Sequence, residues 1–233
     1  MNPMEIPKLS IVTHVYNQPE TVARHVEFWK SLDPAVTRQI EFICVDDFSD
    51  PPLQIQRGHL NLRLFRVTDD IDWNMPGCKN LGALMARADW LLFFDIDALV
   101  DERGLASIVG AIDRLNAKTL YNFRRTENGV DVAPHINTLL MSRDSFFLAG
   151  GLDEDFSGHY GYEDVHFHHM WRHHVGNEVL LTDIAFQQLS ARTESLDRDT
   201  TRNQALVHDK IIKQGHAGSV GKLRFRWIEL PTA

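Results

Sequence analysis

The stretch Leu91-Leu-Phe-Phe-Asp-Ile-Asp97 joins a run of apolar residues to two carboxylates that stand one position apart. An apolar run that ends so abruptly predicts a buried strand, and in open α/β sheets ligands bind beyond the carboxyl ends of the strands. We therefore expect Asp95 and Asp97 to lie in a cleft, where paired carboxylates can hold a divalent metal. Taken alone, the pair also fits a cap for a helix that opens near Asp101.

Apolar strands alternate with amphipathic helices in the first hundred residues. Strands are expected over residues 9–15, 40–45, 62–67 and 90–94, and helices over residues 18–32 and 76–88. This alternation predicts a mostly parallel sheet with right-handed crossovers and helices on its faces.

The second half of the chain has a mixed pattern. Strands are expected over residues 119–123 and 136–141, and helices over residues 105–115, 143–149, 163–175 and 202–214. Helical spacing places Phe167, Met170, Trp171 and His174 on one face of the helix at 163–175, which predicts core positions. No internal repeat or long linker divides the chain.

Composition limits the class of protein. A hydrophobic content of 43% supports a real core. The absence of an ~18-residue apolar run and of a signal-peptide pattern predicts a cytoplasmic protein without a transmembrane segment. The two cysteines, Cys44 and Cys78, cannot form a disulfide framework or a zinc cluster.

Charge is unevenly distributed along the chain. The net charge of -8 argues against a protein that binds nucleic acid over its whole surface. Residues 200–227 nevertheless carry six Lys or Arg against one acid, Asp209. This basic tail predicts either a phosphate contact or simply a solvated helix face.

Four segments accompany the acidic pair in a fixed order. They are Ser10-Ile-Val-Thr-His-Val-Tyr-Asn17, Val45-Asp-Asp-Phe-Ser-Asp50, Gly77-Cys-Lys-Asn-Leu-Gly82, and Gly150-Gly-Leu-Asp-Glu-Asp-Phe156 with His159-Tyr-Gly-Tyr-Glu-Asp164. Together they resemble the motifs of GT-A-fold glycosyltransferases, in particular the family two enzymes that use nucleotide sugars. The resemblance covers residues 9–175.

The resemblance implies an α/β fold of the GT-A, Rossmann-like kind. Its sheet is expected to be mixed, mainly parallel and flanked by helices, with a C-terminal acceptor-side region. A single domain over residues 1–233 would comprise a nucleotide-sugar-binding half (about 1–100), an acceptor and catalytic half (about 101–200), and a C-terminal helix with the basic tail (201–233).

The resemblance also assigns the donor side of the site. Asp46 would accept a hydrogen bond from the uracil ring of a UDP-sugar, and Lys79 would contact the diphosphate at a helix start. Asp95 and Asp97 would bind Mn²⁺ or Mg²⁺, because hard cations prefer oxygen ligands. The expected donor-side residues are Thr13, Val15, Tyr16, Asp46, Lys79, Asn80, Asp95 and Ile96. Phe48 replaces a glycine of the family, so a different turn is expected there.

On the acceptor side, the resemblance implies an inverting transfer in which Asp164 removes the proton of the acceptor hydroxyl. Glu163 would orient the acceptor, and Gly161 and Tyr162 would contact it, the tyrosine by stacking. His168 would also contact the substrate, and it would tune Asp164 from one helical turn away. Without the resemblance, Glu163 and Asp164 fit equally well as acids in the first turn of a helix.

This sequence departs from the family pattern at several positions. His166 and Met170 replace an acid and an arginine that follow the catalytic Asp, and Gln187 and Gln188 stand where many members have a metal-binding histidine, which leaves the third metal ligand unassigned. Six histidines occur between residues 159 and 174, but they do not converge on a helical projection, so no zinc site is expected.

Two alternative functions remain open from the sequence. A sugar-nucleotide nucleotidyltransferase has a related sheet, although its glycine-rich, arginine-containing loop is missing here. A non-catalytic module that binds a nucleotide sugar or a polysaccharide is the other. For a transferase, the acceptor is expected to be a saccharide or another hydroxyl compound, with a modified DNA base as a further possibility raised by the basic tail.

Overall fold

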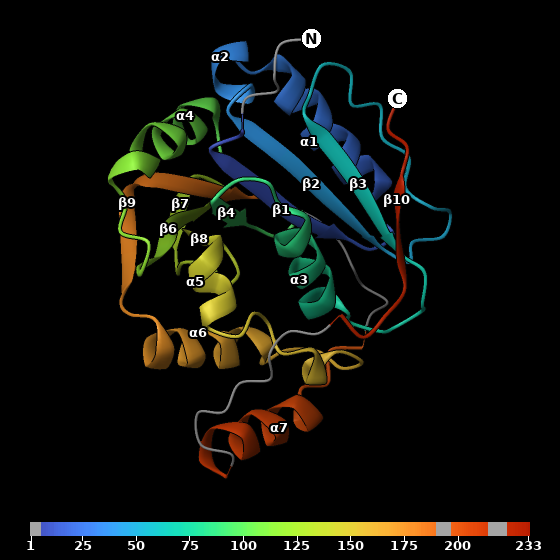
Figure 1. Ribbon diagram of the computed structural model, residues 1–233, viewed down its shortest axis with the longest axis vertical. Coiled ribbons are helices and arrows are strands. Elements are labelled where there is room, and N and C mark those ends of the chain that lie inside the picture. The colour runs from blue at the N-terminus through green and yellow to red at the C-terminus, as the bar shows by residue number, and fades with distance from the viewer. Residues whose placement is uncertain (1–5, 190–196, 214–222) are drawn as a thin grey trace.

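A computed structural model describes residues 6–189, 197–213 and 223–233. The predicted helix end at Gln214 and the basic residue Lys222 lie outside these ranges. Within them, one ten-stranded sheet has helices on both faces (Figure 1). The strands are β1 (Leu9–Val15), β2 (Ile40–Asp47), β3 (Leu62–Val67), β4 (Trp90–Phe93), β5 (Ala98–Leu99), β6 (Leu120–Glu127), β7 (Val130–Val132), β8 (Leu139–Ser142), β9 (Glu178–Gln188) and β10 (Trp227–Leu230).

The helices follow the strands in the expected alternation. They are α1 (Pro19–Ser31), α2 (Pro34–Thr37), α3 (Met75–Met85), α4 (Glu102–Ala111), α5 (Arg143–Leu148), α6 (Glu163–His174) and α7 (Thr201–Ile212), with 3-10 turns at Ile112–Arg114 and Glu154–Phe156. The sheet order is β10-β3-β2-β1-β4-β8-β6-β9-β5, and β7 pairs with β6.

The amino-terminal half forms the parallel part of this sheet. Strand β1 pairs in parallel with β2 and β4, and β2 pairs in parallel with β3. The predicted α/β class and mainly parallel central sheet are confirmed. Because parallel strands end at the same edge, the residues that follow β1, β2 and β4 meet there.

Alternating side chains on the central strands enter two separate cores. In β4, Leu92 packs into a core with Val26 and Trp29 of α1, while Leu91 and Phe93 pack on the opposite side with residues of α3, α5 and α6. Strands that are buried on both faces read as continuous apolar runs, which explains why the sequence predicted them well.

The second half adds antiparallel strands. Strand β8 pairs antiparallel with β4, and β9 pairs in parallel with β6 around an irregularity between Phe123 and Arg124. The strand that was expected from residue 136 begins only at Leu139, and the preceding loop faces the site described below. His174, expected in the core, is exposed at the end of α6.

The C-terminal segment returns to the amino-terminal half. Strand β10 pairs antiparallel with β3, with Trp227 opposite Val67, and α7 packs against α6 (Figure 1). Basic residues of the predicted tail bond to acids of the same chain: Lys210 and Arg224 with Asp155, and Arg226 with Asp69. No helix among the described residues is long and apolar enough to cross a membrane.

Candidate functional site

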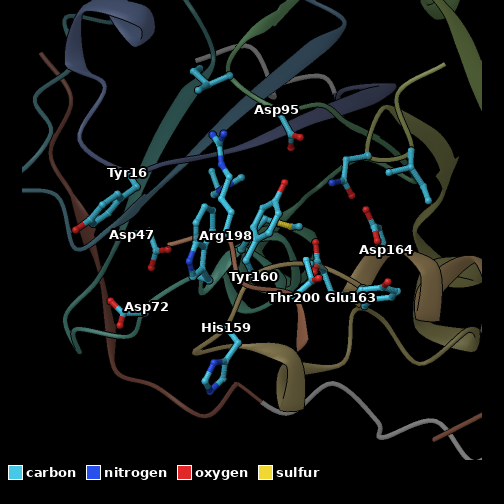
Figure 2. A pocket seen from close by; sticks show the side chains of 18 of the residues that line it. Tyr16, Asp47, Asp72, Asp95, His159, Tyr160, Glu163, Asp164, Arg198 and Thr200 are labelled. Atoms are coloured by element: carbon cyan, nitrogen blue, oxygen red, sulfur yellow. The ribbon is translucent and has the colours of Figure 1, made fainter. Parts of the chain in front are cut away.

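A cavity of about 600 Å³ lies at the edge of the sheet where the parallel strands end. Tyr16 follows β1, Asp47 ends β2 and Asp95 follows β4, so three neighbouring strands contribute to one wall. In Figure 2, Tyr16 and Asp47 lie on one side of the cavity and Glu163 and Asp164 on the other.

The described residues that line this cavity carry an excess of negative charge. Seven are carboxylates, whereas Arg198 is the one Lys or Arg among them. The carboxylates are Asp47, Asp70, Asp72, Asp95, Asp97, Glu163 and Asp164. A further anion such as a diphosphate therefore needs cations close at hand.

Asp95 has a cation of its own. Nζ of Lys79, a residue of α3 that is 1% exposed, lies 3.0 Å from Oδ1 of Asp95, and Nδ1 of His135 lies 3.8 Å from Oδ2. Burial alone would raise the pKa of Asp95, but the charge of Lys79, with contributions from His135 and His14, holds it at about 2. Asp95 is therefore ionised at neutral pH.

Asp97, in contrast to Asp95, has one carboxylate oxygen without a partner. Its Oδ1 atom is buried and has no hydrogen-bond partner. Burial, together with the charge of Asp95, raises the pKa of Asp97, and a hydrogen bond with Gln188 offsets only part of this. An unpartnered carboxylate oxygen beside a second carboxylate suits a hard divalent cation. The described residues hold no cluster of three His, Cys, Asp or Glu side chains arranged for a metal, so other ligands would have to complete its coordination.

The backbone between these two acids is fixed by residues from elsewhere in the fold. Nε2 of His25, buried in α1, lies 2.8 Å from the carbonyl oxygen of Ile96. The amide of Ala98 donates to Asp95 O over 2.9 Å, and the amide of Leu189 donates to Asp97 O over 2.6 Å. Helix α1 and the end of β9 thus hold the acidic turn from both sides.

Glu163 and Asp164 open helix α6 on the other side of the cavity. Their position follows from Tyr162, which adopts a left-handed backbone with φ of 70° and precedes the helix. Glu163 is buried, and this burial, together with the charge of Asp164, raises its pKa to about 7. Asp164 is half-buried, and its Oδ1 accepts a hydrogen bond from the amide of Val165 over 2.6 Å. Glu163 therefore changes its protonation state near neutral pH, and it does so beside a second carboxyl group, that of Asp164.

The two acids at the end of β2 have different environments. Asp46 is fully buried, and it accepts hydrogen bonds from the amides of Ser49 (2.9 Å) and Leu53 (3.1 Å) and from Arg66. It does not line the cavity, whereas Asp47 does, with its buried Oδ1 unpartnered. Burial raises the pKa of Asp47 to about 7. The structure therefore brings Asp47, and not the expected Asp46, to the wall of the cavity.

The turn that follows β2 contains a residue with a left-handed backbone. Phe48 has φ of 58°, in the left-handed region that glycine occupies most easily. The guanidinium group of Arg66 lies 5.3 Å from the centre of the Phe48 ring.

Other expected site residues lie away from the cavity. Thr13 and Val15 are buried in β1. The Asn80 side chain donates to Leu152 O (2.7 Å) and accepts from the amide of Leu152 (2.9 Å), so it joins α3 to the glycine-rich segment. By contrast, Tyr16, Ile96, Gly161 and Tyr162 line the cavity as expected.

His168 was expected to contact the substrate and to tune Asp164, and its contacts are different. Its Nδ1 atom lies 3.0 Å from Glu178, and its Nε2 atom lies 3.1 Å from the carbonyl oxygen of Ile136. The ring is buried and does not line the cavity. It therefore ties α6 to β9 and to the loop before β8.

Several cavity residues were missed by sequence reasoning. Trp73 and Tyr160 form an aromatic pair with ring centres 4.6 Å apart, and the Arg198 guanidinium lies 6.0 Å from the centre of the Tyr160 ring. His14 lines the wall near Asp95, and its burial lowers its pKa to about 4. Trp73, Tyr160 and Arg198 come from separate loops, whereas His14 belongs to β1. His14 and Tyr160 lie inside quoted motifs, but the motifs assigned them no role.

Comparison with known proteins identifies the fold. S. aureus TarS 1-349 in complex with UDP-GlcNAc matches with a TM-score of 0.67 and 16% sequence identity, over 88% of this chain and 66% of that one. GalNAc-T7 with UDP, GalNAc and Mn²⁺ matches with a TM-score of 0.65 and 14% identity, over 88% of this chain and 48% of that one. At such identities the likeness is one of fold.

The present chain is shorter than these structures, and it spans 40% of the longer TarS structure. No curated protein sequence matches it significantly. The sequence profile described as glycosyl transferase family 2 matches residues 10–171, more than half of the chain. The region includes every motif quoted above, from the first strand to the helix that follows Tyr162. The chain therefore belongs to glycosyl transferase family 2.

Proposed function

We propose that this glycosyltransferase moves a sugar from a UDP-sugar to an acceptor hydroxyl with inversion, and that it requires Mn²⁺ or Mg²⁺. The observation that carries the proposal is that a single cavity contains both acid pairs, Asp95 with Asp97 and Glu163 with Asp164. One pair suits the departing diphosphate, and the other suits the incoming hydroxyl. The TarS structure in complex with UDP-GlcNAc and the GalNAc-T7 structure with UDP, GalNAc and Mn²⁺ support this choice of donor and metal.

On the donor side, Asp97 and Asp95 would hold the metal, which when bound supplies positive charge to the leaving diphosphate. The unpartnered Oδ1 of Asp97 fits this role. Lys79 would add a second positive charge beside Asp95. Asp47, at the cavity wall, would accept a hydrogen bond from the base in place of the expected Asp46, and Tyr16 lies on the same side.

On the acceptor side, Asp164 would take the proton of the attacking hydroxyl. The hydroxyl oxygen then forms its bond to the anomeric carbon while the bond from that carbon to the diphosphate breaks, and UDP leaves. A single displacement of this kind inverts the anomeric centre. Glu163 would orient the hydroxyl, since its buried carboxyl with a pKa of about 7 can donate or accept a hydrogen bond near neutral pH.

Donor hydrolysis tests this proposal without knowledge of the acceptor. Release of UDP from a panel of UDP-sugars is measured with Mn²⁺ and with EDTA for the wild type, Asp164→Asn, Asp97→Asn and the exposed control Asp113→Asn. We expect Asp164→Asn to lose about 10²–10⁴-fold in rate while it retains UDP binding. Asp97→Asn should lose Mn²⁺-dependent UDP binding as well. Turnover that EDTA does not affect contradicts the metal requirement, and normal turnover by Asp164→Asn contradicts its role.

The same assay separates the alternatives. A binding module would bind UDP-sugar without hydrolysing it, and a nucleotidyltransferase would release pyrophosphate from UTP and a sugar phosphate. A DNA base as acceptor gains no support from the neighbours, and Lys210, Arg224 and Arg226 already pair with acids of the chain. Saccharides are therefore the first acceptors to screen.

A further inference from the structure

Asn203 of α7 holds the loop that precedes the acid pair of α6. It is 0% exposed, and its Nδ2 atom lies within hydrogen-bond distance of three backbone carbonyl oxygens, those of Phe156 (3.0 Å), His159 (2.9 Å) and Gly161 (2.8 Å). Asn203 lies beyond residue 171, where the family match ends. The family motifs therefore do not account for this contact.

The orientation of the Asn203 amide is fixed by its neighbour. Nη1 of Arg202 donates to Oδ1 of Asn203 over 2.7 Å and to Asp155 O over 2.7 Å. A guanidinium group can only donate, so the atom it faces must be the amide oxygen. The amide nitrogen then faces the loop, as its three acceptors require. Arg202 and Asn203 together face four carbonyl groups of residues 155–161, and the two amide hydrogens of Asn203 are shared among three of them.

The loop needs such external support because its backbone bends sharply. Gly158 and Gly161 have φ of 90° and 83°, and Tyr162 has φ of 70° although it carries a side chain. These turns direct carbonyl groups toward α7, where a buried acceptor without a partner is costly. The same loop presents His159 and Tyr160 to the cavity.

Helix α7 is itself anchored to the segment before the loop. Nζ of Lys210, two turns beyond Asn203, lies 2.8 Å from Asp153 and 2.6 Å from Asp155. Both acids belong to the glycine-rich segment that leads into the loop. Lys210 thus fixes α7 to the glycine-rich segment, and Asn203 of the same helix holds the loop in place.

We infer that Asn203 is a positioning residue for the acceptor side, which holds the backbone of residues 156–161 so that Glu163 and Asp164 face the donor. This inference rests on the proposed function for the role of the acid pair, but the contact itself does not. Removing the amide donor should misplace the acid pair and leave the donor-binding wall at β1, β2 and β4 intact.

The test uses the full chain with Asn203→Asp, which keeps the shape but places a carboxylate against three carbonyl oxygens. Gln204→Glu is the matched control, because it adds the same charge to the same turn of α7 from an exposed position. Asn203→Ser, which keeps one donor, is measured if Asn203→Asp does not fold. Hydrolysis of UDP-GlcNAc with Mn²⁺ gives kcat and KM, and hydrogen exchange of the peptide covering residues 156–164 reports on the loop.

We expect kcat to fall about 10-fold to 100-fold in Asn203→Asp with KM for UDP-GlcNAc unchanged, together with faster exchange of the loop. Gln204→Glu should match the wild type in both measurements. A general loss of fold would lower the active fraction without faster exchange confined to this loop. Unchanged exchange, unchanged kcat, or a rise in KM that accounts for the whole effect would each overturn the inference. If wild-type chain hydrolyses no UDP-sugar, the proposed function fails, and loop exchange alone then decides whether Asn203 holds the loop.

Discussion

The ammonium group of Lys79, in α3, lies 3.0 Å from Oδ1 of Asp95, so one acid of the pair after β4 already has a counter-ion. The two acids of the pair are therefore unequal. Asp95 is held ionised by a buried cation, whereas Oδ1 of Asp97 has no partner. A metal ion that enters the cavity would be attracted most strongly by Asp97, because the charge of Asp95 is already partly neutralised by Lys79.

Replacement of Lys79 should weaken donor binding. In Lys79→Met the carboxylate of Asp95 loses its partner, and the diphosphate loses a nearby positive charge. We expect UDP to bind about 10-fold or more weakly, the scale of a lost charge-assisted hydrogen bond. Isothermal titration with UDP and Mn²⁺ measures this. Lys79→Arg should retain part of the affinity, and the exposed control Lys118→Met should bind like the wild type.

The acids that end β2 should respond differently to the same substitution. Asp46→Asn disturbs three internal hydrogen bonds and should lower the free energy of unfolding by about 1–3 kcal/mol. Asp47→Asn removes the charge of a buried carboxylate whose Oδ1 has no hydrogen-bond partner, so it should preserve stability while weakening UDP binding. Urea denaturation and UDP titration of both variants decide between them. If Asp46→Asn were stable and selectively defective in UDP binding, Asp46 rather than Asp47 would be the residue that contacts the base.

Glu163 should make stability depend on pH. Its pKa of about 7 in the folded state lies above the ordinary value of 4.5, so the folded chain keeps a proton that the unfolded chain releases. Stability is therefore lost as pH rises from about 4.5 to about 7. Glu163→Gln should remove this loss and be more stable than the wild type at pH 8 by about 1–3 kcal/mol, with little difference at pH 4.5.

Thermal unfolding across this pH range provides the measurement. Glu20→Gln, an exposed acid in the first turn of α1, is the control and should follow the wild type at every pH. A difference between Glu163→Gln and the wild type that does not vary with pH would contradict the prediction. The variant should also be a poorer catalyst if Glu163 orients the acceptor.

His25 should support metal binding without touching the metal. Its Nε2 contact with Ile96 O fixes the peptide between Asp95 and Asp97, and His25→Leu leaves that buried carbonyl group unpaired. We expect a loss of about 1–3 kcal/mol of stability and weaker binding of Mn²⁺ in the presence of UDP. Denaturation and titration test the two effects. The exposed His59→Leu is the control, and unchanged Mn²⁺ affinity in His25→Leu would refute the coupling.

The central fold was predictable because its signals are local. The bounds of β1 and β3 match the sequence prediction, since both strands are short and most of their residues are apolar and buried. Strand β9 lacks such a signal, because most of its side chains are exposed or half-buried and its partner β6 lies more than fifty residues earlier. Strand β10 was read as part of a basic tail for the same reason.

The candidate site was predictable where a motif names the residue, and less so where neighbours decide. The motif at residues 159–164 predicted that Glu163 and Asp164 line the site, and both line the cavity. The motif at residues 45–50 did not indicate which of Asp46 and Asp47 faces the cavity. That choice depends on Arg66, a residue of another strand that bonds to Asp46. Trp73 and Arg198 reach the cavity only through long-range packing, which leaves no trace in a local pattern.

The pairing of β10 with β3 has a practical consequence for shortened versions of the chain. A fragment cut at residue 171, where the family match ends, would lack β10 and would leave the backbone hydrogen-bonding groups of β3 uncovered. A mostly buried strand left open in this way recruits strands from other molecules. Such a fragment is therefore expected to aggregate, whereas in the present chain the short strand β10 covers β3 and forms this edge of the sheet.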